Sequence, residues 1–67
     1  MSLTRDGCKA SMKSIAMMGE TSGELAKDFG WRKLSLEEIH VRSVLWNVHR
    51  VGLEARDVLD MMEENDE

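Results

Sequence analysis

Apolar residues in the second half of the chain recur at steps of three and four, a spacing that places side chains on one face of an α-helix. This stripe consists of Val41, Val44, Leu45, Val48, Val51, Ala55, Val58, Leu59 and Met62. Ser35 and Glu38 have the spacing of a capping box, which marks the start of a helix. We therefore predict a helix over residues 36–63, about 42 Å long. The acidic tail over 64–67 should fray, because its charge meets the negative end of the helix dipole.

The first half of the chain carries a second stripe of the same kind, with small residues in its middle. Its members are Cys8, Met12, Ile15, Gly19, Ser22, Ala26 and Phe29. A single helix over residues 6–29 keeps the stripe in phase. However, Gly19 followed by the capping-box pair Thr21 and Glu24 could end one short helix and begin another. Both versions of this first arm stay open. Residues 30–35, which begin with a glycine, form the connection to the long helix.

Two helices joined by a short connection predict an all-α fold, an antiparallel helical hairpin that forms a single domain over residues 1–67. A chain of 67 residues has a thin core, and its single cysteine, Cys8, excludes an internal disulfide. Small scaffolds of this kind often gain stability by self-association. We therefore expect a homo-oligomer, a dimer or tetramer that assembles into a helical bundle.

Composition narrows the class of protein further. No apolar run approaches the length of a membrane span, and Arg5, Asp6 and Lys9 argue against a secretory signal, so we expect a soluble, cytoplasmic protein. The formal net charge is −4, with +2 over residues 1–33 and −6 over 34–67. This acidic total argues against general affinity for nucleic acid.

No pattern typical of catalysis, cofactor binding or metal binding is present. Cys8 has no histidine near it that could act as a base, which favours a packed or unpaired thiol. His40 and His49 lie nine residues apart, on opposite sides of one helix, where they would decorate exposed surface rather than share a metal ion. We therefore expect a non-enzymatic protein without a cofactor.

A second apolar line on the long helix indicates a binding surface. Ile39, Trp46 and Leu53 are spaced by seven, and Arg42, His49 and Arg56 separate this line from the valine-rich stripe. A hairpin buries one stripe against its own first arm, so the second line predicts a partner interface with a sister subunit or a larger protein. The alternative is a kinked first arm that covers both lines.

Glycine inside a helix lowers stability by about 0.5–1 kcal/mol relative to alanine, so Gly52 indicates a position where a larger side chain would not fit. We interpret Val48, Gly52 and Ala55 as a close helix crossing, with the small residues of the first arm as its counterpart.

A different function remains open. Residues 23–31 followed by Leu36 and Ile39 have the apolar spacing of a helix-turn-helix, with Arg32 and Lys33 placed near a phosphate backbone. The next helix begins with two glutamates at 37 and 38, however, where base-reading helices usually offer Arg, Asn or Gln. The leading hypothesis is an adaptor, inhibitor or assembly factor that binds a larger protein, and the alternative is a compact DNA-binding regulator.

Overall fold

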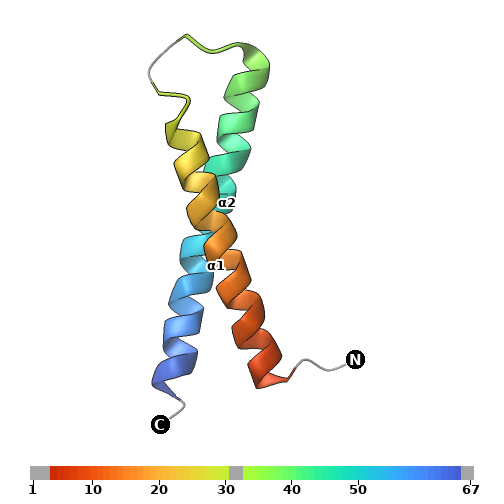
Figure 1. The fold of residues 1–67 in the computed structure, drawn as a ribbon, viewed down its shortest axis with the longest axis vertical. Helices are drawn as coiled ribbons and strands as arrows, with labels where there is room; N and C mark the ends of the chain where they lie inside the picture. The colour runs from red at the N-terminus through yellow and green to blue at the C-terminus, as the bar shows by residue number, and fades with distance from the viewer. Residues whose placement is uncertain (1–3, 31–32, 66–67) are drawn as a thin grey trace.

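The chain folds as two long helices that run antiparallel, as the computed structural model in Figure 1 shows for residues 4–30 and 33–65. Helix α1 spans Arg5–Lys27 and α2 spans Leu36–Glu64. The described residues contain no β-strand. The prediction of an all-α helical hairpin is therefore confirmed. The predicted connection over 30–35 lies partly outside the described residues, at 31 and 32.

Side chains cap both helices at their N-termini. Thr4 accepts a hydrogen bond from the Gly7 backbone N–H at 3.0 Å. In the capping box of α2, the Glu38 N–H donates to Ser35 Oγ at 3.2 Å, and the Ser35 N–H donates to Glu38 Oε1 at 3.1 Å. These bonds satisfy N–H groups that have no partner inside the helix.

Helix α1 is continuous, so the alternative break near Gly19 does not form. It ends at Lys27, two residues before the predicted end, and Asp28 is its C-cap. Gly30 has φ +57°, a left-handed conformation that glycine adopts at little cost and that takes the chain away from the helix. At the other end of the chain, α2 continues to Glu64, one residue beyond the prediction.

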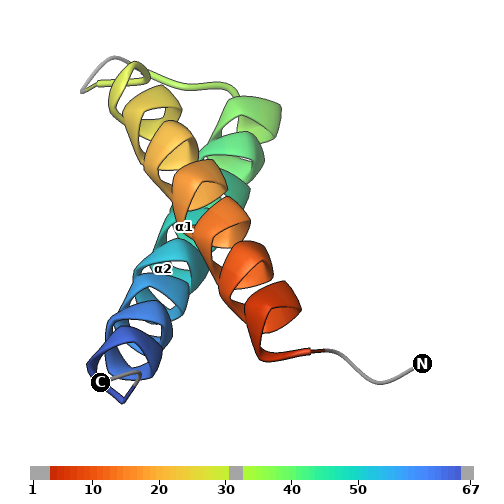
Figure 2. The same cartoon turned by 60° about the horizontal axis from the view of Figure 1, so that its bottom comes forward.

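The two helices cross near their middles, as the turned view in Figure 2 shows. Gly19 of α1 and Gly52 of α2 lie against each other at the closest approach. A Cβ atom on Gly19 would lie 2.6 Å from Gly52 Cα and 3.1 Å from the Val48 carbonyl oxygen. No side chain fits in that space, so only glycine allows the backbones to come this close. Ala26 and Ala55 are the buried apolar side chains of the described part of the chain.

The contact between the helices is narrower than the valine-rich stripe. Leu45, Leu59 and Met62 are half-buried beside Gly52 and Ala55, whereas Val44, Val51 and Val58 are exposed. The assumption that the whole stripe packs against the first arm is therefore wrong. Close approach at the glycines makes the contact a narrow line along α2, and side chains about 100° away around the helix fall outside it.

The hairpin is an elongated body, 49 × 26 × 12 Å in extent, and its shortest dimension spans both helices, because α1 passes in front of α2 in the view down that axis (Figure 1). At the open end, the Arg5 guanidinium donates a hydrogen bond to the Met62 carbonyl oxygen at 2.8 Å. This bond ties the start of α1 to the end of α2. The two broad sides of the hairpin, which flank the crossing, are both accessible, and each has residues from both helices.

Candidate protein interaction site

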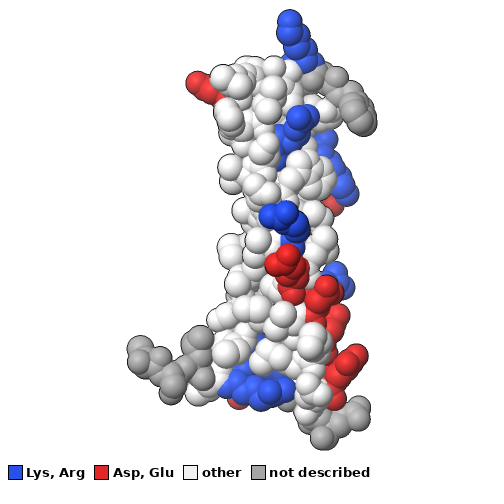
Figure 3. Space-filling model, turned by 180° about the vertical axis from the view of Figure 1, so that it is seen from behind, with Lys and Arg blue, Asp and Glu red and all other residues white. Residues whose placement is uncertain are grey.

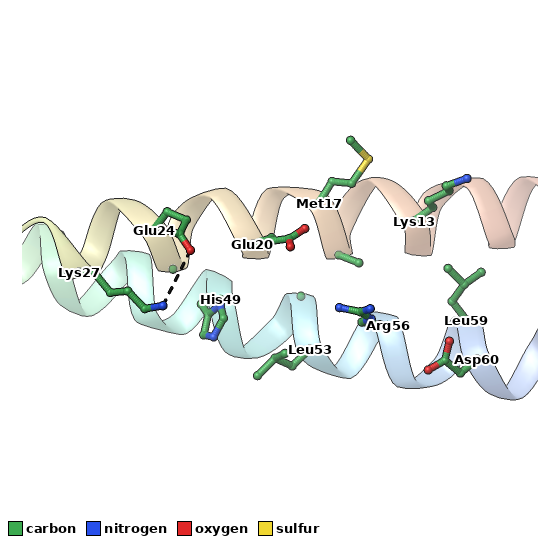
Figure 4. Close-up of a pocket in the computed structure, with 13 residues that line it drawn as sticks. Lys13, Met17, Glu20, Glu24, Lys27, His49, Leu53, Arg56, Leu59 and Asp60 are labelled. Atoms are coloured by element: carbon green, nitrogen blue, oxygen red, sulfur yellow. Dashed lines mark ion pairs between the residues drawn. The ribbon is translucent and has the colours of Figure 1, made fainter.

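One broad side of the hairpin carries a groove of about 570 Å³ between the helices (Figure 4). Its floor includes the small residues Ala16, Gly23 and Gly52. Charged side chains of both signs surround it: Lys13, Glu20, Glu24 and Lys27 from α1 and Arg56 and Asp60 from α2. We call this surface the groove. Small residues form its floor because the helices approach most closely there, and longer side chains form its walls.

The charged wall of the groove is only loosely paired. Lys27 Nζ lies 3.8 Å from Glu24 Oε1, and both side chains are well exposed. An exposed pair at this distance contributes little to stability, because water screens it. Such charges remain available to a partner that offers complementary groups.

His49 connects the two helices beside the groove. Its Nδ1 atom lies 3.0 Å from the Gly19 carbonyl oxygen, so the Nδ1–H tautomer can donate a hydrogen bond there. Gly23 makes room for the ring, since a Cβ at that position would lie 2.6 Å from Nδ1. The sequence interpretation placed His49 on exposed surface, and this is wrong because the ring is half-buried between the helices. The small residues Gly19 and Gly23 on the facing arm allow this contact, but their spacing in the sequence does not identify His49 as the partner.

Trp46 rests against His49 with its ring edge-on, at a centroid distance of 5.5 Å and an interplanar angle of 73°. A T-shaped pair of this kind is a favourable arrangement of aromatic rings. The indole is nevertheless 40 % exposed. Trp46 is thus an accessible aromatic residue that is held in place through His49 and the backbone of Gly19.

Trp46 also lines a smaller hollow of about 290 Å³, together with Ala26, Gly30 and Arg42. Lys27 lines both this hollow and the groove, so the two form one track along the same side of the hairpin. Leu53, 51 % exposed, lines the groove, whereas Ile39, 39 % exposed, lines neither depression. The predicted interface line is therefore accessible, and two of its three members adjoin the track.

The residues interpreted as a close helix crossing lie beneath these surfaces. Gly52 and Ala55 are buried, and Val48 is half-buried with its carbonyl oxygen facing Gly19. They set the distance between α1 and α2 and so determine the width of the groove.

Other kinds of site find little support in the described residues. No three His, Cys, Asp or Glu side chains there gather closely enough to hold a metal ion. Cys8 is free and half-buried. Neither helix within the described ranges is long and apolar enough to cross a membrane.

The arrangement around residues 23–39 differs from a helix-turn-helix. Residues 28–35 separate α1 from α2, whereas that motif joins its helices through a turn of about three or four residues. The helices here run antiparallel and cross each other near their middles (Figure 1). Lys33 is exposed, and Arg32 lies outside the described residues.

Comparison of the chain with protein-family models, curated protein sequences and solved structures gave no match. Any assignment of function therefore rests on the geometry described above.

Proposed function

We propose that this protein is a non-enzymatic interaction module that receives an amphipathic helix of a larger protein in the groove and beside Trp46. In helix-in-groove binding, a few apolar residues on one face of the incoming helix enter the groove, and polar residues beside them make further contacts. In that role the hairpin would act as an adaptor, inhibitor or assembly factor. We place it in the cytoplasm, where reducing conditions keep the Cys8 thiol free.

The observation that carries this proposal is the support behind Trp46. An exposed side chain normally loses conformational freedom when a partner binds, and this loss weakens the complex. Trp46 is already held against His49, which is itself tied to the Gly19 carbonyl oxygen. The indole therefore offers a large contact area at a small entropic cost, which is typical of an interface hot spot.

The walls of the track indicate what the incoming helix carries. Lys27 and Arg56 favour acidic groups, while Glu24 and Asp60 favour basic ones. A helix with an apolar stripe bordered by charges of both signs fits such walls. No described observation favours the DNA-binding alternative, and we expect no measurable duplex binding at physiological salt, given the acidic total charge.

Affinity purification from the native host with quantitative mass spectrometry tests the proposal, with wild type, Trp46→Glu and Met61→Glu as baits. Met61 is an exposed apolar residue of the same helix that lines neither depression, so it is the matched control. A true partner is retained by wild type and Met61→Glu and lost by Trp46→Glu. In titrations with the purified partner, Trp46→Glu should raise the Kd by about 30-fold or more. If every recovered protein binds all three baits equally, the proposed site does not exist.

A further inference from the structure

The broad side of the hairpin opposite the groove is apolar. We call it the valine face and define it by Val44, Val51 and Val58 of α2 with Met18 and Leu25 of α1. All five are exposed, by 44–60 %. Each residue of an α-helix is turned by about 100° from its neighbour. Relative to the crossing glycine of each helix, these five residues lie about 100° around the helix axis in one direction. The groove residues Glu20, Lys27 and Leu53 lie about 100° around it in the opposite direction.

The valine face carries no formal charge over most of its length. The helix positions within about 40° of its centre line are occupied by uncharged residues. On α1, from residue 11 to 25, the additional ones are Ser11, Ser14 and Ser22. On α2, from residue 40 to 62, they are His40, Asn47, Ala55 and Met62. Glu37, seven residues before Val44, marks the limit of the face near the connection. In the view of Figure 3, charged side chains likewise gather on part of the surface and leave a broad uncharged area beside them.

The chain exposes more area than a compact monomer of its mass. The chain exposes 5528 Å². A compact monomer of 7.6 kDa is expected to expose about 4,300 Å². The excess of about 1,200 Å² exceeds the roughly 800 Å² that each partner buries in a standard-size protein interface. One such interface fits on the hairpin with area to spare for the groove.

The arrangement of the two helices leaves the valine face uncovered. The helices stack on each other at their crossing, and the shortest extent of 12 Å spans both of them, so no further layer of the described residues packs on the sides that flank the crossing (Figure 1). A surface that covers the valine face must be apolar and must carry few charges, because the valine face has no charged residue to pair with them. A second copy of the same chain offers such a surface, and a two-fold axis places identical patches against each other.

We infer that the valine face binds the valine face of a second copy, giving a two-fold symmetric bundle of four helices. The grooves of the two copies then point outward, away from the dimer seam. This inference goes beyond the proposed function and does not depend on it, because the two surfaces lie on opposite sides of the hairpin.

Two matched pairs of variants test the inference by sedimentation equilibrium, with circular dichroism on the same samples. On α2, Val51→Glu alters the valine face and Leu53→Glu alters the groove, and the wild-type side chains are 47 % and 51 % exposed. On α1, Met18→Glu and Met17→Glu form the corresponding pair, at 57 % and 62 %. We expect a wild-type dimer, at least about a 30-fold rise in the dissociation constant for the two valine-face variants, and an intact dimer for both controls.

The opposite results overturn the inference. A wild-type monomer at micromolar concentration would do so, and so would a dimer that dissociates with Leu53→Glu and Met17→Glu but persists with Val51→Glu and Met18→Glu. Where the valine-face variants unfold, thermal melting of wild type decides the matter. A dimer that stabilises its own fold has a Tm that rises with chain concentration. A Tm that is independent of concentration contradicts the proposed seam.

Discussion

The two broad sides of the hairpin share the same two helices but differ in chemistry. The valine face carries uncharged residues over several turns of each helix, whereas the groove combines small residues, an adjoining tryptophan and charges of both signs. Burial of an apolar side against any complementary apolar surface is favourable, because it removes apolar area from water. A second copy of the chain always provides such a surface. A grooved side with charged walls discriminates between partners, because mismatched charges cost free energy on burial. This difference is the basis on which we propose assembly for one side and partner recognition for the other.

The crossing of α1 and α2 at Gly19 and Gly52 positions both sides, and its disruption should have the largest effect. We expect Gly19→Val to lower the free energy of unfolding by about 3 kcal/mol, because its Cβ would meet Gly52 Cα at 2.6 Å and the backbones must separate. Chemical denaturation followed by circular dichroism, at one fixed chain concentration, measures this change.

Gly23→Val is the comparison for that experiment. Its Cβ would meet the His49 ring, a side chain that can move, instead of a backbone atom. The loss of stability should therefore be smaller than for Gly19→Val, although both variants place the same β-branched residue in α1. Equal losses would mean that the glycine crossing does not control the distance between the helices.

The fold could be predicted from the sequence to within two residues at the helix ends, because the signals are local. Capping at Ser35 and the three-and-four spacing of apolar residues depend only on the helix itself. Which residues of the valine-rich stripe are covered by α1 and which stay exposed could not be predicted. Whether Val51 is covered depends on how closely α1 approaches, and the glycine pair sets this distance across the hairpin.

The candidate site was likewise only partly accessible to sequence reasoning. The spacing of Trp46 and Leu53 identified an exposed line on α2, since this follows from helix periodicity. The contact between His49 and the Gly19 carbonyl oxygen depends on the register between two helices, which no local pattern reports. The groove itself exists only once both arms are in place.

A smaller effect is expected from His49→Ala, which removes the contact to the Gly19 carbonyl oxygen and the support of Trp46. The free energy of unfolding should fall by about 1–2 kcal/mol, the usual result of losing a partly buried hydrogen bond and its packing. The near-ultraviolet circular dichroism of Trp46 should weaken at the same time. Arg50→Ala, at an exposed position of the same helix outside both the groove and the valine face, is the control. An unchanged near-ultraviolet signal in His49→Ala would show that the indole is not held by this ring.

The smallest expected effect concerns the charged wall of the groove. Glu24 and Lys27 are 75 % and 66 % exposed and 3.8 Å apart, so solvent and salt screen their attraction. Lys27→Ala should therefore change the free energy of unfolding by less than about 0.5 kcal/mol. Because Lys27 faces the groove, the dissociation constant of the proposed dimer should also stay the same within about twofold, whereas Val51→Glu raises it strongly. Denaturation and sedimentation of both variants give the two numbers together. A dimer weakened as much by Lys27→Ala as by Val51→Glu would mean that the charged side also takes part in assembly, and the separation of the two faces would then be wrong.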